Sequence, residues 1–191
     1  MVQDALENLN LYTALRFALS YPDERHLEFF RQISRAAPET LTELRALYIA
    51  LFEAGLPHPR CPLLESHYVP NRPATEVVLE NKLFYKHFGL SVESKAAPDH
   101  LLTQLEFLSW LEHCLASGNP DRESLENAQR DFLERHVSHW ISRAASLLRQ
   151  AGGGCYQVLF EALTEAISDR TGAAGALLSA PLRQPSSSSR R

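Results

Sequence analysis

Two adjacent polar residues, Asp99 and His100, lie directly before a long apolar stretch and are the most promising candidates for chemistry in the chain. Pro98 precedes them and restricts the backbone at this point. The Asp99 carboxylate could cap the following helix beside the positive end of its dipole. The same carboxylate, helped by acids such as Glu65, Glu76 or Glu106, could instead present an anionic site to a basic ligand. Both interpretations stay open on the sequence alone.

His136 and His139 form a second candidate, because an i, i+3 spacing on a helix can place two imidazoles on one metal ion. No matching pair of Cys, His or carboxylate residues stands nearby in the sequence, so surface or structural histidines are the favoured interpretation. The chain also lacks the GxGxxG, P-loop, GxSxG and HExxH patterns. A helical metal-dependent enzyme using His136 and His139 is the alternative to the function developed below.

The apolar stretch after His100 predicts a helix over about residues 101–115. One of its faces carries leucines at spacings of four, three, three and four, at positions 101, 105, 108, 111 and 115. Phe107, Trp110 and Cys114 form a second apolar stripe beside the first. A helix that is apolar over so much of its circumference is normally surrounded by other helices. We therefore expect it to be the central helix of a bundle.

Similar periodicity elsewhere predicts an all-α fold, a single-domain bundle of about seven to nine helices. The expected helices cover about residues 3–20, 22–37, 39–54, 74–88, 101–115, 119–150 and 155–170. Pro22 is expected in the first turn of the second helix, and Gly55 at the end of the third. The five-residue step from Phe132 to Val137 breaks the helical period, so a kink or a split is expected near 134–137. Residues 1–171 form the expected helical domain, and the serine-rich residues 172–191 a disordered tail.

Between Gly55 and Pro73 the helical periodicity disappears, and five prolines disfavour a helix. The segment nevertheless contains several apolar residues, so it is expected either to pack across the helices or to be functional. We expect residues 61–69, together with Phe84 and Leu102, to form the wall of an apolar groove.

Composition narrows the class of protein. The formal net charge of −4 gives no basic footprint for nucleic acid, which disfavours a DNA-binding regulator. Three cysteines without close pairing fit free thiols in a reducing compartment. The first residues lack the features of a secretory signal, and no uncharged apolar run is long enough to span a bilayer. These features predict a cytoplasmic protein that does not insert into membranes.

Several motifs together resemble the TorD/DmsD/NarJ-type chaperones, which assist the maturation of molybdenum-containing oxidoreductases. The main motif is Pro98-Asp99-His100 before the Leu-Glu-Phe sequence at residues 105–107. Supporting similarities lie at residues 19–23, 48–52, 61–68 and 132–140, and the resemblance covers roughly residues 6–168. Each motif is weak alone, but their order and spacing are fairly specific.

The resemblance implies a TorD-like all-α fold, no catalytic activity, no cofactor of its own, and a client protein. Such chaperones bind the twin-arginine signal peptide, or another part, of the client's catalytic subunit until molybdopterin is inserted. By this resemblance, peptide recognition maps onto Pro98, Asp99, His100 and, beside them, Tyr21 and Tyr68. The full set of expected peptide-binding residues is Pro98, Asp99, His100, Tyr68, Tyr21, Glu65, Glu106 and Leu102.

The partner is therefore expected to be the catalytic subunit, or the signal peptide, of a molybdoenzyme. The loop around residues 61–63 favours clients of the dimethylsulfoxide reductase superfamily, acting on nitrate, selenate, chlorate, dimethylsulfide or ethylbenzene. The chain is expected to be a monomer or a domain-swapped homodimer, with breaks at 55–73 and 152–154 as plausible hinges.

Overall fold

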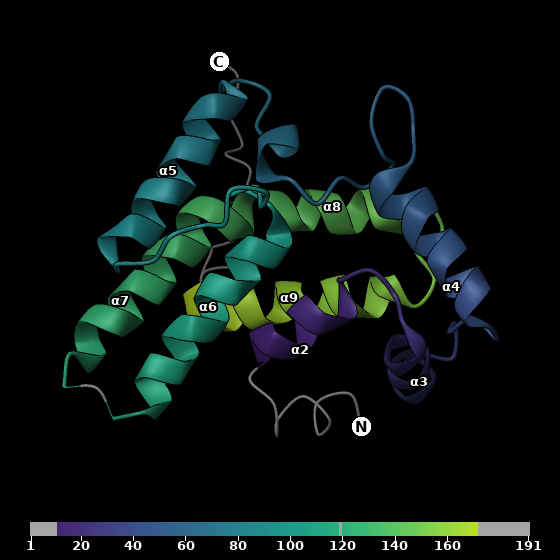
Figure 1. Ribbon diagram of the computed structural model, residues 1–191, viewed down its shortest axis with the longest axis horizontal. Helices are drawn as coiled ribbons and strands as arrows, with labels where there is room; N and C mark the ends of the chain where they lie inside the picture. The colour runs from purple at the N-terminus through teal and green to yellow at the C-terminus, as the bar shows by residue number, and fades with distance from the viewer. Residues whose placement is uncertain (1–10, 119, 172–191) are drawn as a thin grey trace, which may run out of the picture.

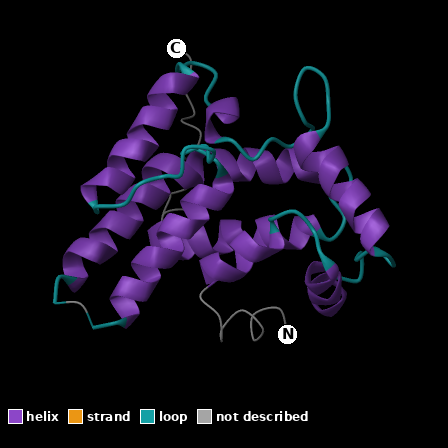
Figure 2. Cartoon of the chain, viewed as in Figure 1, coloured by secondary structure: helices purple, strands orange, loops and turns teal. Residues whose placement is uncertain are grey.

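The computed structural model describes residues 11–118 and 120–171, and within these ranges the chain is built from helices (Figures 1 and 2). The α-helices are α2 (Leu11–Ala18), α3 (Glu24–Ile33), α4 (Leu41–Tyr48), α5 (Ala74–His87), α6 (Leu101–Ala116), α7 (Arg122–Phe132), α8 (Ser138–Gln150) and α9 (Tyr156–Thr171). Two π-helices, η1 (Ile49–Glu53) and η3 (Leu133–Val137), and a 3₁₀-helix, η2 (Glu65–Tyr68), complete them. The all-α prediction is confirmed. The expected tail at 172–191 lies outside the described residues, and no helix within the described ranges is long and apolar enough to cross a bilayer.

The start of helix α3 is fixed by a capping box between Asp23 and His26. Asp23 is the N-cap, and its carboxylate accepts hydrogen bonds from the backbone N–H groups of Arg25 and His26. His26 Nδ1 in turn accepts from the Asp23 N–H at 3.1 Å, which completes a capping box. Pro22 therefore lies just before the cap and not in the first turn, because the aspartate supplies the acceptor that starts the helix.

The break expected near residues 134–137 is the π-helix η3, which joins α7 to α8. The Ser138 N–H donates to the Leu133 carbonyl five residues earlier, so one extra residue is accommodated in the turn. Phe132 and Val137 are both fully buried in consequence. The five-residue step in the apolar pattern was thus the signature of this turn, and the prediction of a break is confirmed.

The third predicted helix, 39–54, is divided in the structure. Helix α4 ends at Tyr48, and η1 continues to Glu53 with a π-type turn. Gly55 follows with φ of +154°, and a Cβ there would lie 2.4 Å from the His58 carbonyl oxygen. Glycine is required at this position because the chain turns tightly back on itself, which is a stronger reason than the simple helix ending predicted.

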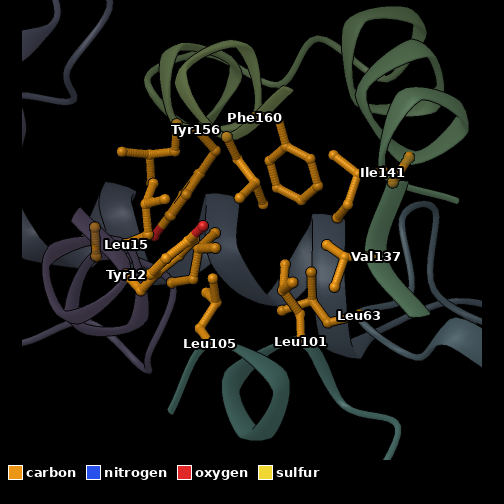
Figure 3. Packing of buried hydrophobic residues seen from close by; sticks show 14 of the residues in the cluster. Tyr12, Leu15, Leu63, Leu101, Leu105, Val137, Ile141, Tyr156 and Phe160 are labelled. Atoms are coloured by element: carbon orange, nitrogen blue, oxygen red, sulfur yellow. The ribbon is translucent and has the colours of Figure 1, made fainter. Parts of the chain in front are cut away.

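Helix α6 buries the leucine face that the periodic pattern predicted, but it is not the central helix of the bundle. Figure 3 shows Leu101 and Leu105 of α6 pointing toward Tyr156 and Phe160 of α9, with side chains of α2 and α8 around them. Leu101, Leu105, Leu108 and Leu111 are all fully buried. Figure 1 shows α8 and α9 running side by side across the molecule, with α5, α6 and α7 on one side and α3 and α4 on the other. The leucine face accounts for the packing of α6, but the expectation of a helix surrounded by other helices is wrong, because α6 lies on one side of the molecule and Glu106 on its other face is exposed.

The three cysteines are free and differ in accessibility, which gives a first prediction. Cys61 and Cys155 are fully buried, and burial raises their thiol pKa values to about 11 and about 12. Cys114 is only half-buried. Because thiolate is the reactive form, a thiol reagent should modify one cysteine rapidly in the native protein and all three after unfolding. Peptide mass mapping should find the rapid label on Cys114; rapid labelling of Cys61 or Cys155 would contradict the packing described.

Candidate functional site

The proline-rich loop, residues 55–73, packs against the segment that enters α6, which is one of the two roles predicted for it. The contacts are an antiparallel bridge between Leu64 and His100, a hydrogen bond from Glu65 N–H to the Asp99 carbonyl at 3.0 Å, and one from Leu101 N–H to the Leu63 carbonyl at 2.8 Å. The two segments are far apart in sequence and hold each other in place at the start of α6. These backbone contacts join the start of η2 to the start of α6.

The Asp99 side chain also contributes to this junction, that is, to the contact between the proline-rich loop and the start of α6. The carboxylate is 2% exposed, and its Oδ2 accepts the Ser66 N–H at 3.2 Å. The N-cap of α6 is His100, whose Nδ1 accepts the Leu102 N–H at 3.2 Å. The helix-cap interpretation of Asp99 is therefore wrong, because the neighbouring histidine takes that position. Pro98 contributes its carbonyl, which accepts the Tyr85 hydroxyl at 2.8 Å.

Glu65 lies at the centre of a buried polar network beneath this junction. It is fully buried, and its Oε2 accepts hydrogen bonds from Asn81 Nδ2 at 2.8 Å and Gln104 Nε2 at 2.7 Å. Its Oε1 lies 3.3 Å from His136 Nδ1 and 3.5 Å from His139 Nε2. The carboxylate therefore connects η2 with α5, α6, η3 and α8. Its acceptor positions are directed at the protein's own groups.

The two histidines that suggested a metal site belong to this network. His136 is 3% exposed, and its carbonyl accepts the Trp140 indole N–H at 2.7 Å. Burial lowers the pKa of His139, while the nearby Glu65 carboxylate opposes that shift. Within residues 11–118 and 120–171 no group of three or more His, Cys, Asp or Glu side chains is arranged to hold a metal ion. The metal-dependent alternative therefore has no ligand set in the described part of the chain.

Two members of the network, Asn81 and Gln104, were not identified from the sequence. Both are fully buried, on α5 and α6 respectively. The available signal was an uncharged amide in a position that the helical period assigns to an apolar face. Buried amides need partners, and that requirement pointed to a buried acceptor elsewhere in the chain. The acceptor's identity could not be read from local periodicity, since Glu65 lies in a segment without it.

A groove of about 1420 Å³ lies on the outer side of the junction. One wall is α6, and the others are α2 and the loop from α5 to α6, which Figure 1 shows running back to the start of α6. Its apolar lining residues are Leu64, Tyr85, Leu90, Val92, Ala96, Ala97, Leu102, Phe107, Trp110 and Ala116. The lining is therefore mainly apolar, with charged side chains distributed among it.

Ionisable side chains lie along the groove, and two of its carboxylates are already paired. Glu106 Oε2 accepts a hydrogen bond from Arg16 at 3.1 Å on the exposed surface. Glu112 Oε1 lies 2.9 Å from Arg170 at the end of α9. Glu93 and Lys95 are exposed on the loop. The lining thus combines an apolar surface with three carboxylates and two permanently basic groups.

The eight expected peptide-binding residues occupy several locations. His100, Leu102 and Glu106 line the groove. Pro98, Asp99 and Glu65 do not line it, and instead make hydrogen bonds within the protein around the start of α6. Of the predicted wall, Leu64 and Leu102 line the groove, but Phe84 packs among other aromatic rings and does not.

The two tyrosines in the expected set lie elsewhere. Tyr68 is 6% exposed, stacks on Trp140 with ring centroids 5.1 Å apart, and borders a smaller hollow of about 510 Å³ beside Arg143. Tyr21 is 50% exposed and packs edge-on against Tyr48. The structure therefore does not bring either ring to the groove.

The capping role of His100 leads to a prediction about pH. Burial lowers the pKa of His100 below its ordinary value of 6.5, with nearby Asp99 opposing the shift. Because the unfolded chain then binds this proton more readily, the free energy of unfolding should fall as the pH drops below about 6.5. His100→Asn keeps a capping acceptor but cannot titrate. In urea unfolding between about pH 7.5 and pH 5.5, wild type should lose more stability than this variant; equal losses would contradict the role of His100.

Comparison with known proteins agrees with the motifs found in the sequence. The sequence profile of the nitrate reductase delta subunit family matches residues 8–146. The chain is 35% identical over 136 residues to the chlorate reductase assembly chaperone protein of Ideonella dechloratans, covering 68% of this chain and 70% of that protein. The same figures hold for the selenate reductase assembly chaperone protein of Thauera selenatis.

A more distant relative serves a different enzyme. The dimethyl sulfide dehydrogenase assembly chaperone protein of Rhodovulum sulfidophilum is 32% identical over 127 residues, covering 60% of this chain and 51% of that protein. These matches confirm the resemblance drawn from the Pro98-Asp99-His100 motif and its accompanying segments. The chain belongs to the nitrate reductase delta subunit family.

Proposed function

We propose that this protein is a cytoplasmic assembly chaperone for the catalytic subunit of a molybdoenzyme, and that it has no catalytic activity of its own. Its similarity to assembly chaperones for chlorate reductase, selenate reductase and dimethyl sulfide dehydrogenase supports this function. The single structural observation that supports it best is the large, mainly apolar groove beside α6. A groove of this kind suits an extended or helical peptide segment of a client.

The client segment is the twin-arginine signal peptide or another part of the catalytic subunit, held until the cofactor is inserted. Micromolar binding requires about −8 kcal/mol, and association itself costs about 4–15 kcal/mol. Two charge-assisted hydrogen bonds to a pair of arginines contribute about 3–6 kcal/mol. Charge alone is therefore insufficient. Burying several apolar side chains, at about 1.5–3 kcal/mol each, supplies the remainder, so the groove carries most of the affinity.

The residues divide into two roles in this proposal. Leu102 offers an apolar contact in the groove, and Glu106 and Glu93 offer carboxylates to basic client residues. Asp99 and Glu65 act indirectly by holding the entrance of α6 and the proline-rich loop in one arrangement. In this proposal the exposed groove lining contacts the client, and the buried network holds the groove in its binding arrangement before the client arrives.

The function is tested by co-expression with candidate catalytic subunits, namely those of chlorate reductase, selenate reductase and dimethyl sulfide dehydrogenase. For the true client, the molybdenum content and activity of the purified subunit should rise when the chain is co-expressed. A chain carrying Leu79→Asp, a change at an exposed leucine on α5 away from the groove, should act like wild type. If every candidate subunit contains the same amount of molybdenum with and without the co-expressed chain, an assembly role for these clients is contradicted.

A further inference from the structure

The last described turn of α9 reaches the edge of the groove. Arg170 binds Glu112 at 2.9 Å, and Glu112 is part of the groove lining. Arg170 also lies over the ring of Tyr12 on α2. Residues 172–191 follow directly after this point in the chain. They therefore start beside the groove, whatever path they take.

Residues 172–191 have the chemistry that the groove lining complements. They contain Leu177, Leu178 and Leu182, three arginines at positions 183, 190 and 191, and no acidic residue. The lining offers apolar side chains and three carboxylates, of which Glu106 and Glu112 are already paired with Arg16 and Arg170, while Glu93 is exposed on the loop. Residues 1–10, which precede α2, instead carry Asp4 and Glu7 and no basic side chain. Charge complementarity thus favours residues 172–191 over residues 1–10 as an occupant.

The distances permit such an occupant. An extended chain spans at most about 3.3–3.6 Å per residue, so Leu177 can lie up to about 20 Å from Thr171. The sixteen residues of α6 extend about 24 Å, at about 1.5 Å per residue. The apolar part of residues 172–191 can therefore lie anywhere along most of the groove without any change in the described helices.

We propose that residues 172–191 occupy the groove when no client is bound, with Leu177 and Leu178 against its apolar lining and the arginines near its carboxylates. This inference rests on the proposed function in one respect: the same groove receives the client. The segment shields the apolar lining from water and from non-specific partners, and a client must displace it. The apparent affinity for the client is then the intrinsic affinity multiplied by the fraction of molecules in which the groove is free.

Trp110 reports occupancy of the groove without any client. It is half-buried in the groove lining, whereas the chain's other tryptophan, Trp140, is fully buried. In the full chain, Leu177→Asp with Leu178→Asp should release the segment and raise the acrylamide quenching constant of Trp110 about twofold. The same pair of changes in a Trp110→Phe background should leave the remaining fluorescence unaltered. An unchanged quenching constant in the first variant would overturn the proposal.

A matched variant distinguishes the other possible occupants. Leu6→Asp with Leu9→Asp makes the same change in residues 1–10 and should leave Trp110 quenching as in wild type. An increase in this variant alone would assign the groove to residues 1–10 and overturn the proposal. An increase that depends on protein concentration would assign it to a second copy, with the same consequence.

The client measurement separates this inference from the proposed function. If residues 172–191 fill the groove in nine-tenths of the molecules, the Leu177→Asp/Leu178→Asp chain should bind a client signal peptide about tenfold more tightly. Equal affinity of both chains would contradict competition at the groove. If no client peptide binds either chain, the proposed function fails, and the quenching of Trp110 still decides whether the segment occupies the groove.

Discussion

Replacing Glu65 by alanine is expected to lower the free energy of unfolding by about 2–5 kcal/mol, the range for large-to-small substitutions that leave a cavity in a packed core. The change leaves the Asn81 and Gln104 amides without their 2.8 Å and 2.7 Å acceptor. Asn81 keeps the Val77 carbonyl and Gln104 keeps the His136 carbonyl as acceptors, so the cost comes from the lost charge-assisted hydrogen bonds and from the cavity that the side chain leaves. Because domains of this kind are stable by about 5–15 kcal/mol, the variant should unfold at much lower urea concentration.

The control for Glu65 is the exposed carboxylate of Glu106, whose side chain is 63% exposed in its ion pair with Arg16. Glu106→Ala should cost about 0–1 kcal/mol, because solvent screens the pair. Glu65→Gln should fall between the two, since it keeps the side chain's shape and one oxygen acceptor. A Glu65→Ala cost no larger than that of Glu106→Ala would contradict the structural role of the buried network.

Leu102→Asp should have the largest effect on client binding. Removing one apolar contact of about 1.5–3 kcal/mol from the groove predicts a roughly 10-fold to 100-fold weaker affinity in calorimetry with the client peptide. Leu102 lies in the first turn of α6, where a carboxylate interacts favourably with the helix dipole. The variant should therefore stay folded, and thermal unfolding measured in parallel checks this point.

Leu79→Asp provides the matched comparison for Leu102→Asp. Leu79 is 53% exposed on α5 and is not part of the groove lining, so the same change there should leave the peptide affinity within about twofold of wild type. If both aspartate variants bind equally well, the groove is not the client site. If both bind poorly while remaining folded, the effect of charge is general and not specific to the groove.

Much of the helical architecture was predictable because each helix carries its own periodic pattern. The leucines of α6 identified a helix with a fully buried face, and the five-residue step from Phe132 to Val137 located the π-helix η3. The π-helix η1 after Tyr48 was not predicted, since its residues fit an ordinary helical pattern as well. Local pattern thus indicates where helices lie but does not always indicate their exact winding.

The candidate site was less predictable, because its arrangement depends on contacts between segments far apart in sequence. The sequence singled out Asp99 and Glu65 as peptide-binding candidates, but both are buried and bind the chain's own groups. His100 was expected to contact the client and is also the helix cap. The loop from α5 to α6 forms a wall of the groove without any periodic signal. Only the folded chain shows which polar residues face outward.

Site-specific photo-crosslinking tests the central claim, that the client is held in the groove beside α6. A photoreactive benzoylphenylalanine replaces Ala96 in the groove lining, or Ser142 in the smaller hollow beside Tyr68. With the client's catalytic subunit co-expressed, position 96 should crosslink strongly to a defined client segment and position 142 weakly or not at all. Crosslinks from position 142 in the absence of any from position 96 would contradict the proposed site.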